Sequence, residues 1–274
     1  MPPRLFDAHN HLQDERFAPH LPGLLAACDA EGIVRMVVNG SCEEDWPRVL
    51  ALARAHPQVL PSFGCHPWYL HERSPAWQES LVRCLDAIPA GVGEIGLDRW
   101  KEGLDAAAQE AAFVWQLRLA AERGLPASVH CLQAWGWMFE VLRREPRPAC
   151  GFLLHSYGGP AEMIVPLARL GAYFSFPGYF LHERKARQRE VFRHVPADRL
   201  LVETDAPDQL PPPDRIRHPL ADATGSPLNH PANLGVIHEA LAALRGESPE
   251  TLARQLAENF QRLFGPILYP PARL

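Results

Sequence analysis

The chain has 274 residues, of which 47% are hydrophobic and 22% are charged, and its formal net charge is −5. This composition is that of an ordinary globular protein and argues against a disordered, collagen-like or membrane-embedded chain. The negative charge disfavours sequence-independent binding along a long nucleic acid, but it leaves a small substrate or the end of a strand open. The length fits one domain, which we expect to span residues 1–274.

The N-terminal segment and the cysteines indicate the cellular compartment in which we expect the protein. No apolar stretch near the start is long enough for a signal sequence or a spanning helix. The six cysteines lie far apart and form no Cys-x-x-Cys pair, which favours reduced thiols over a disulfide framework. We therefore expect a cytoplasmic protein without membrane contact, and a monomer by default.

Eight short β-rich runs alternate with segments whose apolar residues recur at helical spacing. The β-rich runs cover residues 5–11, 33–40, 59–66, 91–98, 125–130, 151–157, 172–178 and 200–205. The helical segments between them cover residues 21–31, 46–56, 77–88, 106–123, 135–144, 160–170 and 185–193. Several runs are almost continuously apolar, as expected for strands buried on both faces.

This alternation predicts an α/β protein built as a single (β/α)8 TIM-type barrel. An open, doubly wound parallel sheet is the main structural alternative. In a barrel of this kind the functional site lies at the C-terminal ends of the strands.

The last quarter of the chain departs from the alternation. Residues 206–231 are rich in proline and show no periodic pattern, so we expect a loop folded over the site. A helix over residues 233–244 follows. A final helix begins with Ser248 as N-cap and Pro249 in its first position, and it is closed by Gly265.

Polar residues gather at the ends of the predicted strands. Asp7, His9 and His11 are two residues apart at the end of the first strand, so their side chains share one face. Two neutral imidazoles placed in this way can bind one cation. A pair of histidines at a strand end can also be hydrogen-bonded polar residues without a metal.

Four later strands also end in potential ligands, namely Glu94, His130, His155 and Asp205. Each of them alone could be a buried histidine or a capping acid. Their position at the same end of successive apolar runs is not what core packing requires, so these four residues together with His9 and His11 predict a metal site. Glycines beside Glu94 let a ligand approach the backbone closely.

The sequence resembles the TatD-type metal-dependent hydrolases of the amidohydrolase superfamily over nearly its whole length. The segments that carry the resemblance are residues 7–11, 64–67, 93–98, 126–130, 154–155, 175–178, 203–207, 229–234 and 259–264. The resemblance implies two divalent ions, with zinc, manganese or magnesium as candidates. It implies that His9, His11 and Asp205 hold one ion, that His130 and His155 hold the other, and that Glu94 bridges them.

The same resemblance suggests roles for three further carboxylate and imidazole groups. Asp205 would accept the proton of the attacking water as general base. Glu203 lies one layer deeper than Asp205 and would hydrogen-bond a ligand histidine, although a structural buried acid is an equal alternative. His66 projects toward the same opening and would contact the substrate or orient water, or else be structural.

The sequence departs from the family pattern at the expected substrate rim. Where the family often has a Ser-Arg pair, Cys131 and Leu132 follow His130; Trp68 and His230 replace a usual histidine and glutamate; and Arg99 precedes Trp100 where an aromatic residue is usual. We also expect Asp98, Trp135, Trp137, Tyr157 and Asn229 near this rim. The departures spare all six predicted ligands.

The most specific function that the resemblance implies is a 3′-5′ exodeoxyribonuclease that acts on the end of single-stranded DNA. A hydrolase of a small amide, ester or lactone is an alternative, because the same activated water attacks a carbonyl carbon on this fold. From another class, a metal-containing binding protein with little turnover is the second alternative.

Overall fold

The computed structural model describes residues 3–268 of the chain, so the ends of the expected domain, residues 1–2 and 269–274, lie outside the described residues. Within this range eight parallel strands form one sheet in chain order. They are β1 (Leu5–Asn10), β2 (Ile33–Asn39), β3 (Val59–Phe63), β4 (Gly91–Asp98), β5 (Ala127–Leu132), β6 (Phe152–Leu154), β7 (Ala172–Pro177) and β8 (Leu200–Glu203). Nearly all of their residues are buried, as the apolar runs predict.

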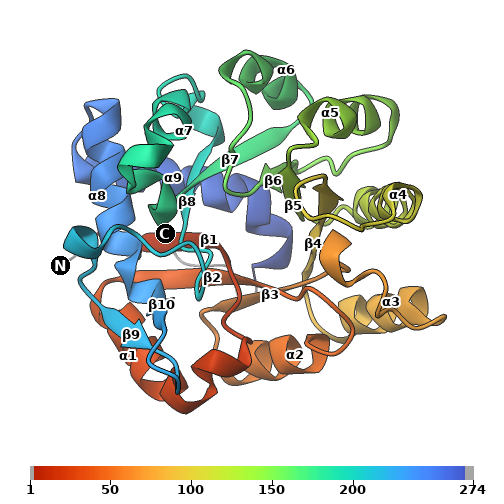
Figure 1. Cartoon of the computed structure of the whole chain (residues 1–274), viewed down its shortest axis with the longest axis horizontal. Helices are drawn as coiled ribbons and strands as arrows, with labels where there is room; N and C mark the ends of the chain where they lie inside the picture. The colour runs from red at the N-terminus through yellow and green to blue at the C-terminus, as the bar shows by residue number, and fades with distance from the viewer. Residues whose placement is uncertain (1–2, 269–274) are drawn as a thin grey trace.

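The sheet curls until its first and last strands meet. Just beyond the strand ends, the backbone N–H of Asp205 donates to the carbonyl of His9 at 3.0 Å, and that of His11 donates to the carbonyl of Ala206 at 2.8 Å. These bonds join β1 to β8 and close the barrel, which confirms the predicted (β/α)8 architecture over an open sheet. Figure 1 shows the strands at the centre and the helices outside them.

The helices follow the strands with bounds close to the predicted ones. They are α1 (Leu21–Ala30), α2 (Trp46–Ala55), α3 (Trp77–Ala87), α4 (Ala106–Arg123), α5 (Trp135–Arg144), α6 (Ile164–Arg169), α7 (Ala186–Val191), α8 (Leu234–Arg245) and α9 (Pro249–Phe264). Local signals set their ends: Asp105 caps the start of α4, and Gly124 ends it with a left-handed φ of 64°. None of the helices within residues 3–268 is both long and apolar enough to cross a bilayer.

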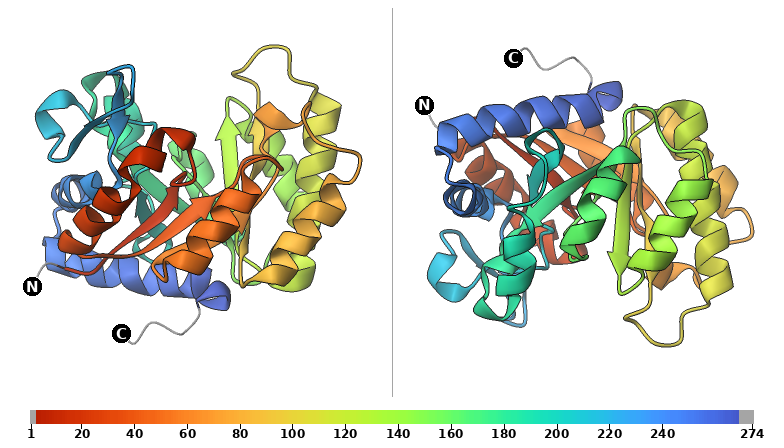
Figure 2. Two further views of the ribbon diagram at one scale, coloured as in Figure 1. Left: turned by 90° about the horizontal axis from the view of Figure 1, so that it is seen from below. Right: turned by 90° about the horizontal axis from the view of Figure 1, so that it is seen from above.

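The last helix covers one end of the barrel. Figure 2 shows α9 (dark blue) lying across the end of the barrel opposite the loops that follow the strands. Its residues Phe260, Leu263 and Phe264 pack with strand residues such as Phe6 and Tyr173 in one buried cluster. The predicted caps are confirmed, since Ser248 accepts a hydrogen bond from Thr251 N and Pro249 opens the helix. The open end of the barrel is therefore the end where the strands finish.

Three predicted strands are too long because the chain leaves the sheet early. After β3, the N–H of His66 bonds to the carbonyl of Ser41 in a neighbouring loop at 2.9 Å. After β6 and β8, Ser156 and Asp205 adopt left-handed backbone conformations with φ of 45° and 52°, which turn the chain out of the sheet. The polar residues at these positions thus sit on loops just above the barrel.

The expectation of a loop over residues 206–231 that covers the site is wrong. The segment contains a short hairpin of β9 (Pro219–Ala221) and β10 (Pro227–Asn229). It lies on the side of α1, where His218 Nε2 is 3.1 Å from Glu31 Oε1 (Figure 1). Within this segment only Asp208 and Gln209 line the cavity above the barrel, so the cavity stays open.

The buried Asn259 on α9 provides a test of how the last helix holds the barrel. Its Nδ2 donates to the carbonyls of Ala197 and Leu200 at 2.7 and 2.8 Å, at the start of β8. Asn259→Ala leaves these carbonyls without a donor, so we expect a loss of roughly 2 kcal/mol in the free energy of unfolding. Urea denaturation measures it, with the exposed neighbour Glu258→Ala as control; equal stability of both variants contradicts this role.

Candidate metal centre

A large cavity opens at the C-terminal ends of the strands. Its volume is about 1260 Å³, and its lining combines acidic, aromatic and imidazole side chains. Five of the six predicted ligands line it directly: His11, Glu94, His130, His155 and Asp205. His9 is fully buried beneath them. All eight residues that the sequence singles out for the site, including His66 and Glu203, come together here.

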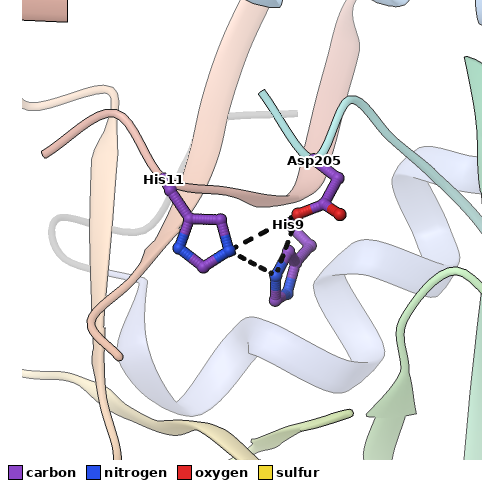
Figure 3. A group of neighbouring side chains, drawn as sticks. All are labelled: His9, His11 and Asp205. Atoms are coloured by element: carbon purple, nitrogen blue, oxygen red, sulfur yellow. Dashed lines mark hydrogen bonds and ion pairs between the residues drawn. The ribbon is translucent and has the colours of Figure 1, made fainter. Parts of the chain in front are cut away.

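The first group consists of His9, His11 and Asp205. His9 and His11 leave the end of β1, and Asp205 faces them from the turn after β8 (Figure 3). The two Nε2 atoms are 3.3 Å apart, and each lies 3.4–3.5 Å from Asp205 Oδ1. Three ligand atoms of this kind, within 4.8 Å of one another, could hold one metal ion.

Glu94, on β4, lies between this group and a second one. Its Oε2 is 3.5 Å from His9 Nε2 and 3.3 Å from His11 Nε2. Its Oε1 is 2.8 Å from His155 Nε2 and 3.1 Å from His130 Nδ1. Each carboxylate oxygen therefore faces a different pair of imidazoles, which is the arrangement that a carboxylate shared by two cations requires.

The opposite ring nitrogens show which atoms are free for a cation. His11 Nδ1 is 2.8 Å from the carbonyl of Asn39 and donates to it, so in the neutral ring Nε2 carries the lone pair that a cation could bind. His130 Nε2 donates to Asp98 Oδ2 at 2.8 Å, so its Nδ1 is free instead. Such partners fix the tautomer and the orientation of a ligand histidine. The residues present thus fit divalent cations.

His66 differs from the other four imidazoles. Its Nε2 is 3.4 Å from Glu94 Oε1, and with Glu94 and His130 it forms a third group that could hold a metal. However, its Nδ1 accepts a hydrogen bond from the backbone N–H of Trp68 at 3.2 Å. In the neutral ring the proton then resides on Nε2. Burial lowers the pKa of His66 to about 4, so the neutral form prevails at pH 7 and presents a donor to the cavity.

The carboxylates of the cluster are held in their ionised form. Burial raises the pKa of Glu94, but the nearby His66 and His155 outweigh burial and hold it well below its ordinary value. Burial likewise opposes ionisation of Asp205, but its contacts with His11 and His155 lower its pKa to about 2. Two ionised carboxylates among buried imidazoles create a strong local preference for positive charge.

Glu203 and Gln209 support the cluster from below and from one side. Glu203 is fully buried, accepts hydrogen bonds from Ser156 Oγ and Ser175 Oγ, and lies 3.6 Å from His155 Nδ1. Gln209 Nε2 donates to Asp205 Oδ2 at 2.6 Å, which leaves Oδ1 toward His9 and His11. Gln209 was not predicted, because no sequence pattern marks an amide four residues after the aspartate.

A glycine allows β4 and β5 to approach each other at the site. Gly96 has a φ of 157°, and a Cβ there would lie 2.0 Å from the carbonyl oxygen of His130. No other residue fits this space without moving the backbone of β5. Gly96 therefore places Glu94 and His130 at contact distance.

The predicted rim is only partly correct. Trp68, Trp100, Cys131, Leu132 and Trp135 line the cavity as expected. Trp137 and Arg99 instead form a cation–π pair, 4.9 Å from the guanidinium carbon to the ring, in a separate surface depression. Tyr157 and Asn229 are buried: Tyr157 packs against Phe174, and Asn229 donates to the carbonyl of Thr204. Residues near strand ends pack inward when their neighbours are apolar, which the pattern alone did not reveal.

Comparisons with known proteins match this fold and this set of residues. The family model "TatD related DNase" matches residues 6–265. The chain belongs to this family. The matched range contains both groups and Glu94, and the family identifies the protein as a TatD-type metal-dependent hydrolase.

Relatives with solved structures or curated names cover the whole barrel. A 3′-5′ ssDNA/RNA exonuclease TatD of Enterobacter lignolyticus is 33% identical over 267 residues, 95% of this chain and 99% of the relative. An uncharacterized metal-dependent hydrolase, YabD of Bacillus subtilis, is 28% identical over 95% of this chain and 98% of the relative. The crystal structure of the TatD homologue YJJV from Escherichia coli superposes with a TM-score of 0.87 at 28% identity, over 97% of this chain and 99% of that one. The protein uses a divalent metal.

Substitution of Asp98 tests whether its hydrogen bond with His130 positions that imidazole for metal binding. Asp98→Asn removes the charge that holds His130 Nε2 and weakens the control of its tautomer, so we expect divalent metal affinity to fall roughly 10- to 100-fold. Competition with a chelator measures the affinity. Asp105→Asn, which keeps a capping side chain away from the site, is the control. Unchanged affinity in the Asp98 variant contradicts this positioning role.

Proposed function

We propose that the protein is a divalent-metal-dependent phosphodiesterase that removes nucleotides from the 3′ end of single-stranded DNA. The observation that carries this proposal is the shared Glu94, whose two oxygens face two separate groups of ligand atoms. Two cations a few ångströms apart are the arrangement that stabilises both the attacking and the leaving oxygen of phosphoryl transfer. The relatives that are 3′-5′ ssDNA/RNA exonucleases support the same class of substrate.

The distances support two ions with the following ligands. His9, His11 and Asp205 would hold one ion, His130 and His155 would hold the other, and Glu94 would offer a carboxylate oxygen to each group. Four imidazole nitrogens with carboxylate oxygens suit zinc or manganese, and magnesium is the alternative with harder ligands. We place the whole site in one domain of a monomeric protein.

When bound, divalent ions at these residues would supply a water of lowered pKa and would polarise the phosphoryl oxygen under attack. Asp205 accepts the proton of the attacking water, because it is ionised and Gln209 fixes its orientation. The water oxygen bonds to phosphorus while the bond to the leaving deoxyribose 3′ oxygen breaks, and that oxygen takes up the proton that Asp205 accepted from the water. His66 donates from Nε2 to a phosphoryl oxygen, since its Nδ1 is occupied by the N–H of Trp68.

The shape of the cavity favours a strand end over the alternatives. A small amide, ester or lactone would call for a narrow apolar pocket, whereas this cavity is wide, mixed in polarity and about 1260 Å³ in volume. A binding protein without turnover would be consistent with a sealed site, but the segment 206–231 leaves the site open. Neither alternative is favoured by the relatives.

The nuclease activity is tested with a single-stranded oligonucleotide and added magnesium, manganese or zinc. We expect stepwise loss of nucleotides from the 3′ end. Asp205→Asn removes the proton acceptor and a ligand oxygen, so we expect its rate to fall at least 1000-fold, in the range found when a central catalytic group is lost.

The label position distinguishes the direction of cleavage. A 5′-labelled strand should shorten gradually, whereas a 3′-labelled strand should release its label at once. Intact DNA and RNA in the presence of a metal-loaded protein would refute the nuclease proposal. Equal rates for the wild type and Asp205→Asn would refute the role of Asp205.

The number of ions is tested by metal analysis after equilibrium dialysis against manganese or zinc. We expect two ions in the wild type and one in either His11→Ala or His155→Ala, because each removes a ligand from one group only. His71→Ala is the matched control, since this exposed side chain lies outside the cavity lining. One ion in the wild type, or an unchanged number in both variants, contradicts the two-ion assignment.

A further inference from the structure

We infer that Trp100, backed by Trp68, is the stacking platform for the base of the 3′-terminal nucleotide. This inference rests on the proposed function and adds the residue that receives the base. Both tryptophans line the cavity, Trp68 from the segment after β3 and Trp100 from the segment after β4. Their ring centroids are 5.9 Å apart, and the ring planes differ by 29°, which is an offset-stacked pair.

Trp68 is fixed relative to the metal centre by one carboxylate. Its Nε1 donates to Asp98 Oδ2 at 2.8 Å, and the same oxygen accepts from His130 Nε2. The other oxygen, Oδ1, accepts from the backbone N–H of Trp100 at 2.7 Å. Asp98 therefore sets the position of a predicted ligand ring, of Trp68 and of the Trp100 backbone together. A base on this platform keeps a defined position relative to a phosphate at the metals.

Trp100 has the free ring surface that a stacking partner requires. It is 57% exposed, whereas Trp68 is half-buried, with Lys101 Nζ 5.0 Å from its ring centroid. Within residues 3–268, only three large hydrophobic side chains are exposed: Trp100, Leu132 and Val165. Two of the three, Trp100 and Leu132, line this cavity. An exposed apolar group beside a polar site marks a place where an apolar ligand surface binds.

The charges of the cavity direct the nucleic acid to the same side. Acidic side chains follow β1, β2 and β8, which are neighbours in the closed barrel: Asp14, Glu15, Glu44, Asp45 and Asp208. The arginines in that half are paired, Arg16 with Asp14 and Asp208, and Arg48 with Glu15. The other half is formed by segments after β3, β4, β5 and β7, and its lining includes the aromatic residues Trp68, Trp100, Trp135 and Tyr179 and the basic Lys185. Besides Glu94, the only acidic residue in the described part of the chain that lines this half is Glu72. Phosphates avoid the first half, so the strand end lies over the aromatic half.

Aromatic platforms bind single strands without reading sequence, because every base has a π-face. A stacking platform of this kind favours a substrate that contains a nucleobase, because a small acyl substrate has no aromatic ring to stack on it. The inference therefore separates recognition, which belongs to Trp100, from hydrolysis, which belongs to the cluster around Glu94.

The test compares two oligonucleotides, one with a normal 3′-terminal base and one with an abasic 3′-terminal residue. Base stacking on an aromatic side chain makes the wild type prefer the intact strand roughly tenfold in kcat/KM. Trp100→Leu keeps apolar bulk without a ring and should lose this preference, while Trp100→Phe should retain most of it. Val165→Ala, an exposed apolar residue on α6 outside the cavity, is the control for losing surface hydrophobicity. Metal content is measured in every variant.

The outcomes separate this inference from the proposed function. If the wild type degrades DNA but shows no preference, or if Trp100→Leu keeps it, the platform is refuted and the nuclease stands. If no protein degrades DNA, the nuclease proposal fails, and binding of the two oligonucleotides by fluorescence anisotropy decides the platform. A difference in affinity that Trp100→Leu abolishes then supports it, and equal affinity of the wild type for both strands refutes it.

Discussion

The shared carboxylate of Glu94 is the constraint on which the site depends. Its Oε2 faces His9 and His11 at the end of β1, and its Oε1 faces His130 on β5 and His155 directly after β6. Residues from distant parts of the barrel can meet one carboxylate only if the sheet closes and β4 and β5 lie close together. The bonds between the ends of β1 and β8 provide the closure, and Gly96 provides the close approach. The barrel is therefore the frame that sets the distance between the two groups.

Much of this arrangement could be predicted from sequence, because it follows from two regular patterns: the alternation of strands with helices, and the recurrence of polar residues at the strand ends. Strand and helix alternation predicted the barrel, and polar residues at strand ends predicted the six ligands that the structure brings together. The rest depends on contacts between distant segments. The hairpin β9–β10 has no apolar period, since its strands are three residues long and largely exposed. The roles of Asn39 and Gln209 as partners of ligand side chains depend on the folded loops and have no local pattern.

The residues that differ from the family pattern lie outside the set of six predicted metal ligands. Trp68 occupies a position where the family often has a histidine, Trp100 follows the departure at Arg99, and both tryptophans lie on the cavity wall. Asp98 nevertheless links them to His130 through its carboxylate. A change of substrate recognition at this wall can thus occur without loss of a ligand. The six predicted ligands are accordingly all present although residues of the rim depart from the family pattern.

The cluster also couples metal binding to the stability of the fold. Five imidazoles and two ionised carboxylates converge in a buried space, and burial opposes the charged form of each. Without a cation these groups share protons, which is why neighbouring histidines shift in opposite directions: burial lowers the pKa of His9, whereas the carboxylates outweigh burial and raise that of His11. A cation would replace those protons, and because only the folded chain brings these ligand atoms together, its binding would stabilise the barrel by mass action. The carboxylates to which we assign the binding of metal would therefore also add to the stability of the closed barrel when a cation is bound.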